Sequence, residues 1–200
     1  MKTTNLPTID VQFWDDLFNK GTMPWDRNQT PKELKHYLNR VSSDPKTVFI
    51  PGCGAAYEVA HFIEYGHDVV AMDYSEEAVN LAKSKLGQHK DAVRLGDVFG
   101  AEFSQPFDVI YERAFLAALP REKWDDYFAM IQRLLPSDGL LVGYFVIDDE
   151  YRSRFPPFCL RSGELESQLE PSFNLIESAP VADSVDVFQD KEHWMVWQKK

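Results

Sequence analysis

The sequence is poor in cysteine, in long apolar runs and in basic residues. Only Cys53 and Cys159 occur among 200 residues, which argues against a disulfide framework and favours a reducing cytoplasm. No stretch approaches the roughly 18 consecutive apolar residues of a membrane span, and no N-terminal segment joins a basic start to a long apolar run. We therefore expect a cytoplasmic protein that is not inserted in a membrane.

Acidic residues outnumber basic ones by 32 to 21, and the formal net charge is −11. Such a charge repels phosphate backbones and anionic bilayers, and no segment gathers its basic residues into a patch. Small molecules are therefore favoured as partners over nucleic acid and membranes.

The five histidines are scattered, and neither H-E-x-x-H nor paired C-x-x-C motifs occur. We expect no metal site, and nothing in the sequence requires more than a monomer.

What the sequence does contain is a regular alternation of strand-like and helix-like patterns. The predicted helices lie at 10–20, 31–41, 56–66, 75–87, 120–136 and 162–170. The predicted strands lie at 46–50, 67–73, 92–97, 107–112 and 138–147, with two more at 173–182 and 186–200. Thr30, Pro31 and Glu33 supply the cap, first-turn proline and acid that favour the start of the second helix.

This order predicts the fold class. Alternating strands and helices require right-handed crossovers and a sheet covered on both faces. The last two strands have no helix between them, which predicts an antiparallel hairpin at one edge. We therefore expect an α/β protein with a Rossmann-like, doubly wound, mostly parallel seven-stranded sheet. One domain spanning 1–200 is expected, with a helical segment of about 9–45 packed on it.

The stretch VFIPGCGAAYEVAHFIEYGHDVVAMD, residues 48–73, contains the candidate ligand site. Ligands of doubly wound sheets bind beyond the carboxyl ends of the strands, where Gly52 and Gly54 follow the first strand. Glycines permit a sharp turn and let a ligand approach amides at a helix N-terminus. Tyr57 stands where G-x-G-x-x-G has its third glycine, which weakens the interpretation as a pyrophosphate site. Asp73 ends the second strand, where a carboxylate accepts hydrogen bonds from ribose hydroxyls.

Three residues at the end of the third predicted strand, 97–99, extend this site. Asp97 is placed to accept a hydrogen bond from an adenine amino group, while Val98 and Phe99 are placed to pack on the ring. With the glycines and Asp73, they indicate a nucleoside that carries no obligatory phosphate. The alternative is that the glycines only form a turn and that Asp73 only caps the next helix. A nicotinamide-dependent oxidoreductase is a further alternative, against which the missing third glycine argues.

Four stretches resemble the class I S-adenosylmethionine-dependent methyltransferases and, within them, the thiopurine S-methyltransferase superfamily, which includes thiol and halide methyltransferases. They are FWDDLFNKGTMPWDRNQTP, IPGCGAAYEVAHFIEYGHDVVAMDYSEEAV, GDVF with FDVIYERAFLAALPREKW, and GLLVGYFVIDD with FPPF. The glycine motif is general among methyltransferases, whereas W-x-x-x-x-x-x-G-x-x-P-W-D and FLAALP are more specific. The likeness covers nearly the whole chain.

The resemblance implies S-adenosylmethionine as the methyl donor and no metal. It implies that Gly52 and Gly54 lie beneath the methionine part of the donor, Asp73 at the ribose, and Asp97 with Val98 at the adenine edge. The other implied donor contacts are Phe18, Trp25, Arg27, Pro51, Tyr74, Phe99, Glu112 and Arg113.

The resemblance also implies a lid and a substrate side. The N-terminal segment is implied to close over the site through Trp14, Phe18 and Trp25. Phe18 departs from the tryptophan of thiopurine-type members, and Arg27 stands where some members have a glutamine. Arg113 matches an arginine near the donor carboxylate and the substrate, where halide-type members have a tyrosine, so an organic substrate is favoured. The implied substrate contacts are Trp14, Trp25, Arg113 and Phe158, and the prolines of FPPF are expected to shape the pocket rim.

The predicted function is methyl transfer to a small acceptor, in the first place the sulfur of an aromatic or heterocyclic thiol. A thiol with a pKa of about 8.5 supplies thiolate at neutral pH, whereas a hydroxyl needs a base. Arg113 and Asp148 are the candidate catalytic residues, and Asp26 and Asp149 are further carboxylates; for each acid, a solvated loop position is the alternative. The alternative functions are O-methylation of a hydroxylated heteroaromatic, methylation of a halide or thiocyanate, and donor binding without turnover.

Overall fold

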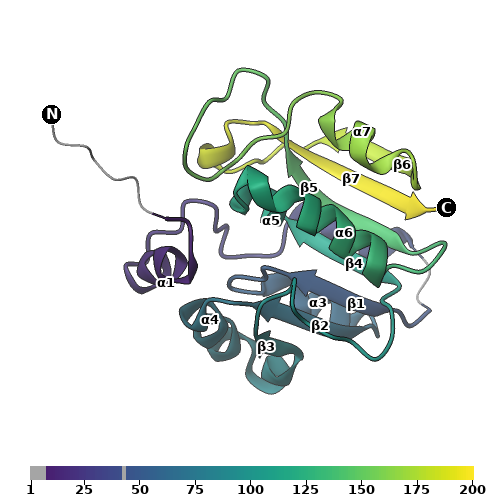
Figure 1. The fold of residues 1–200 in the computed structure, drawn as a ribbon. Coiled ribbons are helices and arrows are strands. Elements are labelled where there is room, and N and C mark those ends of the chain that lie inside the picture. Colours follow the sequence, from purple (N-terminus) through teal and green to yellow (C-terminus); the bar gives the residue numbers. More distant parts are fainter. Residues whose placement is uncertain (1–7, 42–43) are drawn as a thin grey trace, which may run out of the picture.

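The computed structural model describes residues 8–41 and 44–200, and its centre is a seven-stranded sheet with strand order β3-β2-β1-β4-β5-β7-β6 (Figure 1). The strands are β1 (Thr47–Pro51), β2 (Asp68–Asp73), β3 (Val93–Leu95), β4 (Val109–Arg113), β5 (Leu140–Val146), β6 (Phe173–Pro180) and β7 (Glu192–Lys199). Strands β1 to β5 run parallel, and β7 lies antiparallel between β5 and β6. The predicted doubly wound sheet with its C-terminal antiparallel hairpin is confirmed.

Helices cover both faces of the sheet. They are α1 (Val11–Asn19), α2 (Lys32–Arg40), α3 (Tyr57–Glu64), α4 (Glu76–Leu86), α5 (Phe115–Ala118), α6 (Trp124–Leu134) and α7 (Glu164–Leu169), with short 3-10 turns η1 (Gly87–Ala92), η2 (Arg121–Lys123) and η3 (Asp186–Phe188). Figure 1 shows α6 in front of the sheet and α3 behind it. No helix in the described ranges is both long and apolar enough to cross a membrane.

The strands divide the apolar side chains between two cores because successive residues of a strand point to opposite faces. Val48 and Ile50 of β1 pack in one core with Phe62 of α3. Phe49 lies between them in sequence and packs in the other core with Ile131 of α6. A strand buried on both faces needs a continuous apolar run, which is why the segment before Gly52 has no polar residue after Thr47.

Helix α1 lies beyond the carboxyl ends of the parallel strands, where it contacts α4 (Figure 1). The Asp10 side chain caps α1 by accepting a hydrogen bond from the Phe13 amide at 3.1 Å. Asp15 of α1 accepts hydrogen bonds from the Ser75 hydroxyl at 2.5 Å and the Glu77 amide at 3.4 Å. The N-terminal segment is thus attached to the first turn of α4, directly after β2.

Three local predictions were wrong. The last strand begins at Glu192 rather than at residue 186, because Gln189 and Asp190 have φ values of +49° and +58° that no strand accommodates. Thr30 does not cap α2, since its hydroxyl donates to the Tyr57 carbonyl at 2.9 Å and Pro31 is the capping residue. The short helix α5 was missed, because four residues are too few for a helical period to be recognised.

Candidate active site

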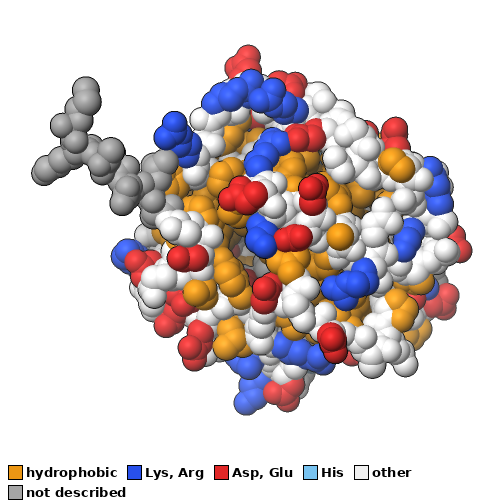
Figure 2. Space-filling view, viewed as in Figure 1, with side chains coloured by type: hydrophobic (Ala, Val, Ile, Leu, Met, Phe, Trp, Pro, Cys, Tyr) orange, Lys and Arg blue, Asp and Glu red, His pale blue; other side chains and the backbone are white. Residues whose placement is uncertain are grey.

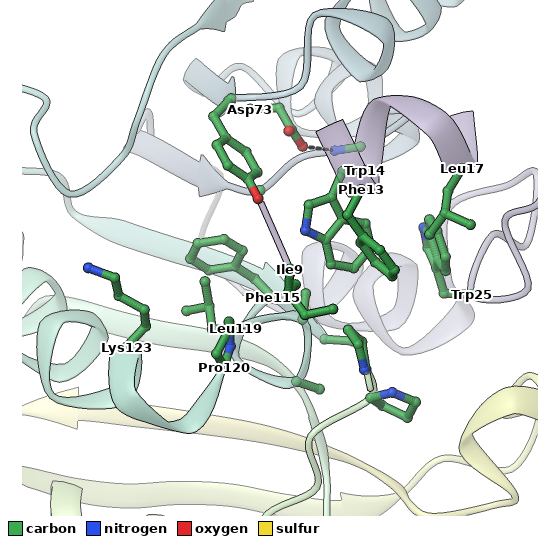
Figure 3. A pocket seen from close by; sticks show the side chains of 18 of the residues that line it. Ile9, Phe13, Trp14, Leu17, Trp25, Asp73, Phe115, Leu119, Pro120 and Lys123 are labelled. Carbon is green, nitrogen blue, oxygen red and sulfur yellow. Dashed lines mark hydrogen bonds between the residues drawn. The ribbon is translucent and has the colours of Figure 1, made fainter. Parts of the chain in front are cut away.

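A cavity of about 490 Å³ opens at the carboxyl ends of the parallel strands, beside α1. It lies where the strand order reverses, because β1 has β2 on one side and β4 on the other. Figure 3 shows Phe13, Trp14 and Trp25 on one side of the cavity, with Phe115 and Leu119 across from them. Figure 2 shows hydrophobic side chains gathered beside α1, whereas acidic and basic side chains are interspersed over the rest of this face.

The turn after β1 contributes two glycines with left-handed backbones. Gly52 and Gly54 have φ values of +57° and +51°, which glycine adopts without the steric cost of a β-carbon. A β-carbon on Gly52 would stand 2.1 Å from Cδ2 of Phe115, so the close approach at this glycine is made by an aromatic side chain of the protein itself. A β-carbon on Gly54 would meet only Phe18 Cζ, at 3.8 Å. The expected space for a ligand is therefore present at Gly54.

Asp73 is held in a fixed orientation at the end of β2. Its Oδ2 accepts a hydrogen bond from the Gly54 amide at 2.9 Å, drawn in Figure 3, and its Oδ1 accepts one from the Ser75 amide at 3.0 Å. Burial raises the pKa of Asp73, and the amides of Ser75, Gly54 and Tyr74 oppose this rise. A carboxylate has about four lone-pair sites, so both oxygens keep acceptor capacity toward the cavity.

The loop after β3 lines the next part of the wall. Asp97 is exposed, and its Oδ1 accepts a hydrogen bond from the Phe99 amide at 3.0 Å. Val98 is buried, and the Phe99 ring stacks on Phe115 with the centroids 6.3 Å apart. Tyr74, which follows Asp73, lines the same cavity. This part of the wall thus combines one carboxylate with apolar faces, as the sequence predicted.

The aromatic residues of the N-terminal segment form one cluster above the cavity. Trp25 contacts Trp14 edge to face at 5.5 Å between ring centroids and Phe18 at 6.0 Å. All three rings line the cavity. Two residues that were not predicted, Phe13 and Leu17, line it from the same face of α1; their spacing of four residues was the available signal.

Arg113, at the end of β4, is one of two cations that line the cavity in the described ranges. Its side chain is 13% exposed, and its guanidinium lies 5.6 Å from the centre of the Tyr144 ring. Nε and Nη2 have no hydrogen-bond partner. Arg113 also lines an adjoining pocket of about 80 Å³, together with Pro51 and Glu58. Burial raises the pKa of Glu58, and Arg113 opposes this rise.

Four predicted site residues do not line either pocket. The Arg27 side chain turns to Asp183, with Nη2 2.8 Å from the carboxylate. Glu112 is fully buried behind the cavity wall. Asp148 accepts a hydrogen bond from the Glu150 amide at 2.9 Å, and Phe158 packs at the margin of the second core. Their roles in binding or catalysis stay predictions.

The structure adds lining residues that sequence reasoning missed. They are Ile9, Thr22, Pro24, Gly96, Phe115, Leu119, Pro120, Glu122, Lys123, Val187, Phe188 and three alanines after Arg113. Those at 114–123 belong to the stretch FDVIYERAFLAALPREKW that carries the family resemblance, whereas nothing local marks Val187 and Phe188. The prolines of FPPF line the cavity as expected. Within the described ranges, no group of three or more His, Cys, Asp or Glu side chains is arranged to hold a metal ion.

Sequence comparison assigns the chain to a known family. Residues 9–200 match the family model described as thiopurine S-methyltransferase. The chain is 28% identical to probable thiol methyltransferase 2 of Arabidopsis thaliana, covering 79% of this chain and 71% of that protein. It is 27% identical to the thiopurine S-methyltransferase of Pseudomonas syringae pv. tomato, covering 84% of each chain.

Solved structures show the same fold at lower identity. A 1,6-didemethyltoxoflavin-N1-methyltransferase of Burkholderia thailandensis, with 1,6-didemethyltoxoflavin and S-adenosylhomocysteine bound, superposes with a TM-score of 0.74 at 19% identity, covering 98% of this chain and 93% of that one. The matches favour the methyltransferase prediction over the oxidoreductase and the binding module without turnover. The chain belongs to the thiopurine S-methyltransferase family and is an S-adenosylmethionine-dependent methyltransferase.

Proposed function

We propose that the protein methylates the sulfur of a small aromatic or heterocyclic thiol within the 490 Å³ cavity. The relatives named for thiol and thiopurine substrates support a sulfur acceptor. The chemistry of the cavity wall supports a sulfur acceptor independently.

Several features of the wall fit S-adenosylmethionine. The Asp73 carboxylate, fixed by two amides, retains acceptor capacity for ribose hydroxyls. Val98 and Phe99 offer apolar surface for the adenine ring. The Arg113 guanidinium lines the cavity and suits a carboxylate, and Gly54 leaves space for a ligand. When bound there, the donor supplies a methyl carbon that its sulfonium makes electrophilic.

The observation that carries the choice of sulfur is the lack of a buried base on the acceptor side. Besides Asp73 and Asp97, the only carboxylate among the described residues that line the 490 Å³ cavity is Glu122, which is exposed; Asp26 and Glu58 line the adjoining pocket instead. A hydroxyl acceptor needs a base to take its proton, whereas a thiol with a pKa of about 8.5 ionises without one. Asp148, the predicted base, lies outside the cavity wall. The Arg113 guanidinium further favours an anionic nucleophile such as a thiolate.

The N-terminal segment of about 9–45 serves as the lid of this site. Its rings, Trp14, Phe18 and Trp25, cover the cavity and exclude water from an anionic nucleophile, which strengthens the electrostatic interactions inside. An aromatic face also tolerates a sulfonium charge. Holding two reacting atoms at about 3 to 3.5 Å contributes roughly 7 to 11 kcal/mol to lowering the barrier. Alignment and exclusion of water are therefore the main work of these side chains.

We also infer a cytoplasmic monomer without nucleic-acid or membrane partners. The net charge of −11 and the interspersed charges of Figure 2 support this inference. Light scattering of the purified protein is expected to give the mass of one chain. A mass of two or more chains at micromolar concentration would contradict it.

An acceptor screen tests the proposed function. Radiolabelled S-adenosylmethionine is incubated with the protein and, separately, a thiophenol, a heterocyclic thiol, the matching phenol and heterocyclic alcohol, iodide and thiocyanate. Labelled product is expected from the thiols and not from the oxygen analogues, because no buried base serves a hydroxyl. Product from an oxygen analogue, iodide or thiocyanate, and none from either thiol, would overturn the proposal.

A further inference from the structure

Glu192, the first residue of β7, is a fully buried carboxylate that the methyl-transfer scheme does not use. Its Oε2 accepts hydrogen bonds from the Ser184 hydroxyl at 2.6 Å and the Val185 amide at 3.4 Å. Its Oε1 has no hydrogen-bond partner. A buried carboxylate is costly unless a cation or several donors compensate it, so these two neutral donors leave the charge largely uncompensated.

The missing compensation comes from Arg113, whose Nη2 lies 3.7 Å from Glu192 Oε1. The two residues stand on strands that are not neighbours, because β5 lies between β4 and β7. Arg113 pairs with Tyr144 of β5, and its guanidinium lies over that ring at 5.6 Å. The guanidinium therefore crosses β5, with an aromatic face beneath it and the carboxylate at its far end.

We infer that Glu192 is a positioning residue, which fixes one end of the Arg113 guanidinium so that its remaining N–H groups face the anionic group of a bound ligand. The inference rests on the proposed function of Arg113. The 3.7 Å between Arg113 Nη2 and Glu192 Oε1 is short enough for direct attraction between the two charges but too long for a hydrogen bond. Nη2, which is itself buried, thus faces Glu192 without a hydrogen bond, while the charge of Glu192 keeps the guanidinium in place.

The same carboxylate connects Arg113 to the wall of the cavity. Ser184 and Val185, which donate to Glu192, belong to the connection between β6 and β7. Two residues of this connection, Val187 and Phe188, line the cavity. Loss of the charge alone is therefore expected to disturb the guanidinium, whereas loss of the hydrogen-bonding side chain would also disturb the apolar wall beside it. A purely structural role of Glu192 would disturb the wall and not depend on Arg113.

The test is a double-mutant cycle between Glu192→Gln and Arg113→Met, in which kcat and KM are measured with the best thiol of the acceptor screen. Each single variant is expected to lose tenfold or more in kcat/KM, and the double variant no more than Arg113→Met alone. Glu192→Asp, which keeps the charge, is expected to retain more activity than Glu192→Gln. The matched control is Glu177→Gln on β6, whose carboxylate binds Trp194 Nε1 and Arg40 outside the cavity; it is expected to stay within twofold of wild type.

The outcomes separate the two hypotheses. If Arg113→Met keeps wild-type kcat/KM, the proposed role of Arg113 fails. If Arg113→Met loses activity but Glu192→Gln does not, or if the two losses multiply, the role of Glu192 fails while that of Arg113 stands. Calorimetry with S-adenosylhomocysteine identifies the anion: weaker binding by folded Glu192→Gln indicates the donor carboxylate, whereas unchanged binding with a raised KM for the thiol indicates the thiolate.

Discussion

Glu112 allows the most direct test of the electrostatics behind the active site. The residue stands next to Arg113 in β4, and no part of its side chain is exposed. Its Oε2 accepts hydrogen bonds from the Phe115 amide at 2.6 Å and the Leu116 amide at 3.4 Å, while Oε1 has no partner. Burial raises the pKa of Glu112 from its ordinary 4.5 to about 8, against the lowering effect of those two amides.

This shift makes stability fall as pH rises. Between pH 4.5 and about 8, folded Glu112 retains a proton that the unfolded chain has lost. Because the unfolded state then binds fewer protons, the free energy of unfolding decreases by up to about 1.4 kcal/mol per pH unit. Over the whole window the loss approaches about 5 kcal/mol, which is an upper bound. Glutamine has the shape of the protonated acid and cannot ionise, so Glu112→Gln is expected to remove this loss.

Urea unfolding followed by tryptophan fluorescence at about pH 5, 7 and 9 measures the effect. Glu112→Gln is expected to match wild type near pH 5 and to exceed its stability by several kcal/mol at about pH 9. The exposed Glu170→Gln is the control and is expected to show no such trend. A difference between Glu112→Gln and wild type that stays constant with pH would refute the argument.

Two further variants test the wall of the cavity. Gly52→Ala is expected to lose about 2 to 4 kcal/mol in denaturant unfolding, because a left-handed alanine and a contact with Phe115 both cost free energy. Gly66→Ala, with φ +86° and open space, is the control, and an equal loss there would contradict the role of the contact. Asp73→Asn is expected to weaken S-adenosylhomocysteine binding by about 1.5 to 3 kcal/mol in calorimetry, as a charge-assisted acceptor is lost. The exposed Asp68→Asn on the same strand should bind normally, and unchanged affinity in Asp73→Asn would show that the ribose site is misplaced.

The sequence predicted the sheet and most of one cavity wall because those features are local. Buried parallel strands are continuous apolar runs, and the residues that follow them must meet at one edge of the sheet. Gly54, Asp73 and Val98 therefore reach the same cavity from three different strand ends. Residue spacing alone was sufficient for this inference.

The remaining features depend on partners that are distant in sequence. Arg27 bonds Asp183, 156 residues away, and nothing near Arg27 predicts that contact. Glu112 follows the apolar residues of β4, and this position alone does not predict that its carboxylate is buried. The carboxylate accepts a hydrogen bond from the Phe115 amide, and the Phe115 ring packs against Gly52, which is distant in sequence. Strand β7 was predicted too long because its apolar alternation continues past the point where left-handed residues end the strand. For Arg27 and Glu112 a tertiary contact decided the outcome, and for β7 the backbone conformation of two residues did.

Three buried acids of this protein gather near the carboxyl edge of the sheet. Glu58 follows β1, Asp73 ends β2 and Glu112 stands in β4, and burial raises the pKa of all three. Each acid costs folding free energy at neutral pH, so a fold selected for stability alone would replace them with apolar residues. Perturbed carboxyl groups cluster at functional sites because an apolar, water-poor environment strengthens the interactions that hold charged ligands. The carboxyl edge of this sheet is accordingly the part of the molecule where we expect stability to be given up for binding.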